Sequence, residues 1–263
     1  IDYSILDQHA DSYRKIRNTF RYLLGNINDN FEKIDLKKID LSEMPELEQF
    51  MLHKIFFLNE NFKNYFKKYD FHNLYKELLN FCTVDLSAFY FDIRKDTLYC
   101  DSVDSKKRQS TIILLNIILN SLLRWFAPIL SFTTEEIYRL IMNNNKSIHL
   151  KKFLEFPANF KNENLNQKWL ELIKIRNVCN ISIEEKRASK EIGSSLEASL
   201  KINLDKKLYD ISKDIDFSEL CITSNAEVSY LENFETKVQT TKAEGSKCPV
   251  CWKLSIDPCP RHS

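Results

Sequence analysis

Glycine and proline are scarce in this chain. Its 263 residues include three glycines and six prolines, which disfavours the tight turns of sandwiches and barrels and favours long helices. The glycines are Gly25, Gly193 and Gly245, each alone in its stretch. A glycine-rich phosphate loop of either common type therefore cannot be built.

Strong net charge and long apolar runs are also absent. The formal net charge is +1, so any surface for nucleic acid must be a local patch. The sequence contains no run of 18 apolar residues and no signal-peptide pattern, and we expect no membrane partner and a cytoplasmic location. Because the chain starts at Ile1 and not at methionine, we expect a piece of a longer protein or a processed product.

The cysteines predict a metal site. Of seven, four are scattered in apolar contexts and three crowd into the last sixteen residues, which is typical of a reducing compartment and not of a disulfide framework. Cys248 and Cys251 form a CxxC pair, and Cys259 and His262 form a CxxH pair after a short spacer. Four such ligands make a closed tetrahedral site, which predicts one structural zinc ion. A redox pair and chance clustering are the alternatives.

Trp252 directly follows the CxxC pair and lies among the cations Lys247, Lys253 and Arg261. An exposed tryptophan among cations stacks on nucleobases while the cations hold phosphate. The alternative is that Trp252 packs against the CxxC turn and supplies its missing core.

The stretch from Asp11 to Asn26 predicts a helix with two faces. Arg14, Arg17 and Arg21 recur at spacings of three and four, beside an apolar stripe with the same spacing. Guanidinium groups in a row suit phosphate oxygens, and a solvated basic face is the alternative. The apolar stripe consists of Tyr13, Ile16, Phe20, Leu23 and Ile27.

Helical spacing continues through Glu46–Lys67, Asp70–Phe89, Ser105–Ala127 and Thr133–Met142, which predicts a helical bundle. The aromatic-rich stretch Asp85–Ser102 is expected to be a core-packing turn with surface ion pairs.

The pattern changes after the bundle. Gln167–Lys190 predicts a helix, Leu196–Leu204 alternates as a half-buried strand does, Lys206–Lys213 predicts a short helix, and Glu219–Thr223 predicts a second strand. The fold class is therefore mainly α, with a small α/β extension. We divide the chain into a helical bundle (1–157), the α/β extension (158–231), and a linker with a zinc-binding module (232–263), where a further strand is expected near residues 237–242.

Five stretches, in this order, resemble the C-terminal part of bacterial isoleucyl-tRNA synthetase, from about Asp7 to His262. They are DSYRKIRNTFRYLLGN, NFCTVDLSAFYFDIRKDTLYCDS, LLRWFAPILSFTTEEIY, IGSSLEA and KCPVCW. The resemblance implies a helical bundle of the class I synthetase anticodon-binding type, an α/β extension and a zinc module. It also implies a parent enzyme that joins isoleucine to its tRNA using ATP.

The resemblance places the family's zinc ligands on Cys248, Cys251 and Cys259, with His262 in the fourth place. The family usually has a cysteine there, after a longer spacer. Trp252 matches the family's CxxCW pattern.

The resemblance implies two partners, the anticodon stem-loop of isoleucine tRNA and the catalytic domain of the same enzyme, in a monomer. Basic residues are expected to hold phosphates, while unstacked bases are read by stacking and hydrogen bonds. The expected tRNA contacts are Arg14, Lys15, Arg17, Arg21, Arg94, Trp252 and Lys253.

The family's HIGH and KMSKS motifs do not occur in this sequence. We therefore expect no catalytic residue here, no activity of this chain alone, and ATP and magnesium only in the catalytic domain of the parent enzyme. Three alternatives remain: the same domain of a valyl, leucyl or methionyl enzyme, a zinc-stabilised protein-interaction module, and an enzyme acting alone.

Overall fold

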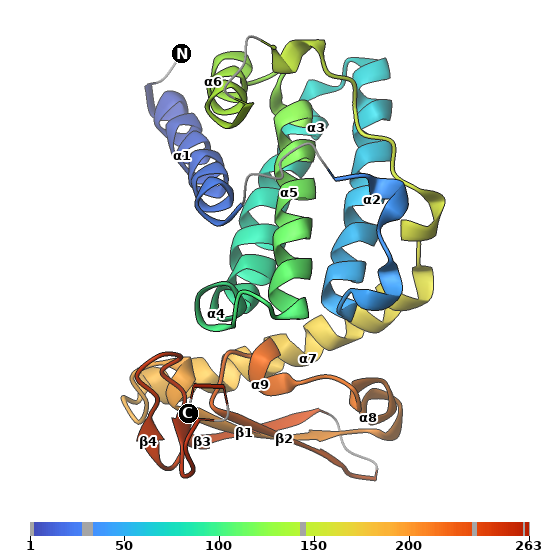
Figure 1. Ribbon diagram of the computed structural model, residues 1–263. Coiled ribbons are helices and arrows are strands. Elements are labelled where there is room, and N and C mark those ends of the chain that lie inside the picture. The colour runs from blue at the N-terminus through green and yellow to red at the C-terminus, as the bar shows by residue number, and fades with distance from the viewer. Residues whose placement is uncertain (1–2, 28–33, 143–145, 233–235, 260, 263) are drawn as a thin grey trace. The chain divides into compact units, whose positions relative to one another are not determined.

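The protein forms two compact units, Ile1–Asn162 and Glu163–Ser263, which we call the helical unit and the sheet unit. Figure 1 shows the computed structural model. The structure describes residues 3–27, 34–142, 146–232, 236–259 and 261–262. A mainly α fold with a small α/β extension, as predicted, is confirmed.

The helical unit contains long helices joined by short 3-10 turns. Its elements are α1 (Tyr3–Asn26), η1 (Leu36–Lys38), η2 (Leu41–Glu43), α2 (Glu46–Lys68), α3 (Phe71–Asn80), the π-helix η3 (Phe81–Phe91), α4 (Asp92–Cys100), α5 (Lys106–Phe126), α6 (Ser131–Met142), η4 (Ile148–Leu150) and η5 (Ala158–Phe160).

The apolar stripe predicted on α1 is confirmed. Ile16, Phe20 and Leu23 are buried, and the Phe20 ring meets Phe126 of α5 edge to face, with 5.9 Å between the ring centroids. The helix begins at Tyr3, earlier than the predicted Asp11. The stripe therefore holds the second half of α1 against the core.

The turn predicted within Asp85–Ser102 is wrong. The chain is helical through Phe81–Phe91 and Asp92–Cys100. No glycine or proline interrupts this stretch, so nothing local ends the helix. The aromatic density reflects burial, since Phe89, Tyr90 and Phe91 all lie in the core.

Helix α5 is the centre of the helical unit and contacts α1, α2, α4 and α6 (Figure 1). Its N-cap is Ser105, whose hydroxyl accepts a hydrogen bond from the backbone N–H of Arg108 at 3.4 Å. Among the described residues, α5 alone is long and apolar enough to cross a membrane, but 83% of its most apolar window is buried inside the structure. A core helix passes the same test, so this is weak evidence for a membrane span.

A buried carboxylate joins four elements of the helical unit. Glu48 of α2 is fully buried, and its two carboxylate oxygens each accept a 2.7 Å hydrogen bond from the Arg94 guanidinium of α4. Tyr90 of η3 donates its hydroxyl to the same carboxylate at 2.9 Å. The Thr111 hydroxyl of α5 lies 3.3 Å from the carboxylate and 2.9 Å from the Lys107 backbone oxygen. The Glu48 carboxylate therefore links α2, η3, α4 and α5 inside the core, away from water.

The sheet unit has one long helix against a small sheet. Its elements are α7 (Glu163–Ala188), η6 (Ser195–Glu197), β1 (Ala198–Leu204), α8 (Lys206–Ser212), α9 (Phe217–Leu220), β2 (Asn225–Tyr230), β3 (Lys237–Lys242), β4 (Ser246–Lys247) and β5 (Leu254–Ser255).

Strand β1 is central in the order β2-β1-β3, parallel to β2 and antiparallel to β3. Its alternate residues, Ala198 to Leu204, are fully buried, as the alternation predicts. Helix α7 packs on the sheet, where the Ser182 and Thr240 hydroxyls lie 2.7 Å apart. The strand predicted at Glu219–Thr223 is wrong: Asp216 caps the short helix α9 there, and the second strand follows as β2.

We predict that Glu48→Ala destabilises the chain by about 3–5 kcal/mol, because it leaves the Arg94 charge buried without its partner. The measurement is the free energy of unfolding in urea, followed by circular dichroism. Glu43→Ala is the matched control, since its ion pair with Lys106 lies on the surface and its midpoint should not move. Equal midpoints for both variants would contradict the role given to Glu48.

Candidate metal centre and nucleic-acid interface

A two-stranded hairpin positions the CxxC pair. Strands β4 and β5 pair Ser246 with Ser255 and Lys247 with Leu254, so residues 248–253 form the loop between them. The loop is closed by backbone hydrogen bonds from Cys248 N to the Lys253 oxygen (2.9 Å) and from Trp252 N to the Cys248 oxygen (3.0 Å). The hairpin therefore turns both cysteine side chains to the same side.

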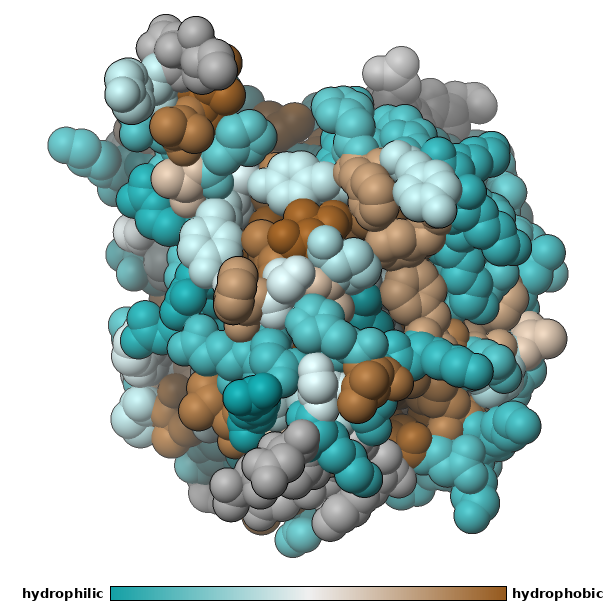
Figure 2. Space-filling model, turned by 90° about the horizontal axis from the view of Figure 1, so that it is seen from above, coloured by the Kyte–Doolittle hydropathy of each residue, from teal (hydrophilic) through white to brown (hydrophobic). Residues whose placement is uncertain are grey.

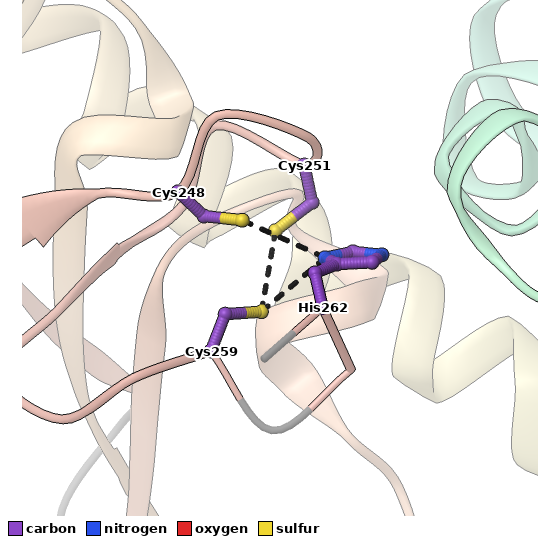
Figure 3. A group of neighbouring side chains, drawn as sticks. All are labelled: Cys248, Cys251, Cys259 and His262. Atoms are coloured by element: carbon purple, nitrogen blue, oxygen red, sulfur yellow. Dashed lines mark hydrogen bonds between the residues drawn. The ribbon is translucent and has the colours of Figure 1, made fainter.

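The side chains of Cys248, Cys251, Cys259 and His262 point toward one another (Figure 3). Their ligand atoms all lie within 4.8 Å of one another. The sulfurs of Cys251 and Cys259 are 3.8 Å apart. The distance to His262 Nδ1 is 3.3 Å from Cys259 Sγ and 3.6 Å from Cys248 Sγ.

The three distances given for single pairs lie close to the edges of a tetrahedral metal site. For zinc bonds of about 2.3 Å to sulfur and about 2.0–2.1 Å to nitrogen, a tetrahedron has edges of roughly 3.8 Å between sulfurs and roughly 3.6 Å between sulfur and nitrogen. The four predicted ligands are thus brought together as a cluster of three thiols and one imidazole that can hold a metal ion.

The two cysteines of the CxxC pair differ in acidity. Backbone N–H groups of Cys251 and Val250 lower the pKa of the Cys248 thiol to about 6, whereas burial raises the pKa of the Cys251 thiol to about 11. At neutral pH the cluster thus offers a thiolate at Cys248. A coordinated cation would deprotonate Cys251 as well.

Three arginines of α1 lie exposed in a row, as predicted: Arg14, Arg17 and Arg21. Arg14 forms an ion pair with Asp11 one turn earlier. Lys15 is also exposed on this helix. The helix therefore presents several cations to solvent while its opposite side is buried.

Arg17 is oriented by Tyr13. Its guanidinium donates to the Tyr13 hydroxyl at 3.2 Å and lies 5.8 Å from the ring centroid. The Tyr13 hydroxyl also lies 2.8 Å from the Thr133 hydroxyl of α6, and these hydrogen bonds, first from Thr133 and then from Arg17, lower the pKa of Tyr13. The sequence pattern places Tyr13 only in the apolar stripe, although its spacing of four from Arg17 is a signal for this contact.

Arg94 is not an RNA contact, which corrects the prediction. Its side chain is 4% exposed and both its hydrogen bonds to Glu48 lie in the core. The sequence places Arg94 among alternating charges, but the partner that buries it lies 46 residues earlier in the chain.

Trp252 is 58% exposed, with Lys247 Nζ 4.9 Å from its ring centroid. It therefore does not serve mainly as core for the CxxC turn. The backbone of Trp252 has a φ of 64°, a left-handed conformation that is uncommon for a bulky residue. Lys253 donates to the Ser218 hydroxyl at 3.5 Å, so its ammonium is directed toward α9.

Comparison with known proteins first identifies the family to which the chain belongs. Residues 48–202 match the family model described as the anticodon-binding domain of tRNA ligase, and the chain belongs to this family.

Individual relatives show which kind of tRNA ligase this chain is similar to. The chain is 68% identical to the isoleucine–tRNA ligase of Pelagibacter ubique over all of its 263 residues, which are 29% of that protein. It is 38% identical to the isoleucine–tRNA ligases of Agrobacterium fabrum and Bradyrhizobium diazoefficiens, over 97% and 95% of this chain and 27% and 26% of those proteins. The chain thus spans less than a third of the length of these curated relatives.

We predict that Gly245→Ala weakens metal binding roughly tenfold or more, a loss typical of forcing a side chain into a strained backbone. Gly245 has a φ of 102°, and a Cβ there would lie 2.1 Å from the Ser255 oxygen. This clash would force β5 away from β4. The measurement is Co²⁺ affinity from the thiolate charge-transfer absorption. Gly25→Ala, where a Cβ meets nothing within 4 Å, is the control and should match the unmodified chain.

Proposed function

We propose that this chain recognises the anticodon stem-loop of an isoleucine tRNA, as part of an isoleucine–tRNA ligase that joins isoleucine to that tRNA using ATP. The observation that carries the proposal is the exposed row of Arg14, Arg17 and Arg21 on α1, in a chain similar along its whole length to isoleucine–tRNA ligases. Guanidinium groups spaced along one helix face suit successive phosphates of an RNA backbone.

Base recognition is proposed for the sheet unit. The exposed ring of Trp252, with the Lys247 ammonium at one face, can stack on an unpaired base of the loop. Lys247 and Lys253 would contribute phosphate contacts beside it. Phosphate contacts hold the RNA without reading sequence, so the discrimination between anticodons is assigned to such base contacts.

The metal is proposed to be one structural zinc ion held by Cys248, Cys251, Cys259 and His262. Three thiols and one imidazole are ligands that zinc prefers, and four protein ligands leave no position for a reacting water. The strands β4 and β5 have two residues each, so metal binding would supply the folding energy that a core cannot.

Catalysis, with ATP and magnesium, is proposed to reside in the catalytic domain of the parent enzyme, which we take to be a cytoplasmic monomer without a membrane partner. Figure 2 shows apolar surface surrounded by hydrophilic side chains. Around α6, Phe132, Leu140 and Leu150 are each more than 70% exposed. We assign these three exposed side chains to contact with the rest of the parent chain. The three-part division at residues 157 and 231 remains our proposal.

The test of the function is binding of the zinc-loaded chain to the anticodon stem-loop of isoleucine tRNA and to the same RNA with its anticodon altered, across a salt series. We expect tighter binding to the native loop at every salt concentration. Arg17→Ala should weaken both complexes and reduce the slope of log K against log salt by about 1.

Lys68→Ala is the control for Arg17, since Lys68 is exposed at the far end of α2 and should leave affinity and slope unchanged. Equal affinity for both loops would assign anticodon identity elsewhere. Tighter binding to valine, leucine or methionine tRNA would favour the related enzymes, and no binding at low salt would favour a protein-interaction module.

We predict one zinc ion per chain and a large loss of zinc affinity in His262→Ala, because three thiols would leave one position to water. The measurement is zinc released to a colorimetric chelator during titration. His72→Ala, an exposed histidine at the start of α3, is the control. Unchanged affinity in His262→Ala would show that the fourth ligand is not His262.

A further inference from the structure

A cleft of about 520 Å³ opens in the helical unit between α1 and the continuous helix formed by η3 and α4. This volume lies in the range of small-molecule sites, about 300–1,000 Å³. Residues from both sides line it, among them Lys15, Asn18, Tyr22, Ser87, Phe91 and Lys95. None of the contacts argued above for Arg17 or Trp252 uses this cleft.

The π-helical winding of η3 produces one wall of the cleft. In a π-helix the hydrogen bonds run from i to i+5, so residues four to five apart share a face. Cys82, Ser87 and Phe91 are spaced in this way and all line the cleft. In an α-helix Cys82 and Phe91, nine residues apart at 100° per residue, would point to opposite sides. Such irregular helices occur frequently at functional sites.

Tyr22 of α1, on the second wall, is fixed against Phe91 of the first wall. The rings of Tyr22 and Phe91 stack with their centroids 4.2 Å apart and an angle of 19° between their planes. The Tyr22 hydroxyl donates to the Phe91 backbone oxygen at 3.5 Å. The Tyr22 phenol is neutral at physiological pH and does not repel an anion, and burial raises its pKa further.

Cations, amide and hydroxyl groups and the carboxylate of Asp92 also line the cleft. Lys15 of α1 and Lys95 of α4 contribute ammonium groups from opposite sides, and Lys95 is held by Asp92 at 2.7 Å. Asn18 offers both a donor and an acceptor, and Ser87 a hydroxyl. The Tyr22 ring, an amide and two ammonium groups together match a base, its polar edge and its phosphate.

We infer that this cleft binds one unstacked nucleotide of the RNA loop, with its phosphate between Lys15 and Lys95 and its base edge toward Asn18. The inference rests on the proposed function, since it names a further subsite for the same RNA. It assigns to the helical unit a base contact in addition to phosphate contacts.

The test fills the cleft from an exposed position. Ser87→Trp places an indole in it, whereas Ala88→Trp places the same side chain on the next exposed residue, which does not line the cleft. The probe is the isoleucine anticodon stem-loop with 2-aminopurine at one loop position at a time. We expect Ser87→Trp to weaken binding about tenfold or more, as loss of a stacked base does, and to abolish the fluorescence change at one position. Ala88→Trp should preserve both.

A second variant tests the phosphate contact without adding bulk. Lys95→Gln should reduce the salt slope by about 1, and Lys76→Gln, an exposed lysine of α3, should not. Unchanged affinity and fluorescence in Ser87→Trp, with an unchanged slope in Lys95→Gln, would overturn the inference while leaving the proposed function in place. Failure of the unmodified chain to bind the stem-loop would overturn both.

Discussion

The Glu48 carboxylate is the constraint on which the helical unit depends. It is fully buried, so its charge must be neutralised and hydrogen-bonded inside the protein. Arg94 of α4 and Tyr90 of η3 do this, and the Thr111 hydroxyl of α5 lies 3.3 Å from the same carboxylate. Because one carboxylate must meet side chains from three other elements, the relative placement of α2, η3, α4 and α5 is fixed together. The wall that η3 and α4 present to α1 is thereby fixed as well.

The chemistry of arginine alone did not predict which guanidinium groups face solvent. Arg17 and Arg94 both lie in polar, charged stretches, yet Arg17 is exposed and Arg94 is buried against Glu48. Helical spacing predicted the exposed row on α1, because that pattern is local. Whether Arg94 is buried depends on a contact between positions distant in the sequence, and neither periodicity nor spacing contains that information.

The same division between local and distant information holds for the backbone. The central strand β1 and the helix α5 follow from their apolar periods, and the metal-ligand cluster follows from the spacing of Cys248, Cys251, Cys259 and His262. The stretch 81–100 did not follow, because aromatic density is equally compatible with a packed turn and with a buried helix. The stretch forms a buried helix and not a packed turn because α1, α3 and α5 contact it on several sides.

The small net charge of +1 limits how this protein would hold RNA in the proposed function. A weak overall field gives little long-range attraction, so affinity must come from contacts at short range. Under the proposed function, the arginine row of the helical unit would supply phosphate contacts on the surface, and the cleft would supply a base contact in a confined space. A cleft whose wall is positioned by a buried ion pair can keep its shape while empty. Binding there would cost little ordering of the protein, which is how a short-range contact gains affinity without a strong field.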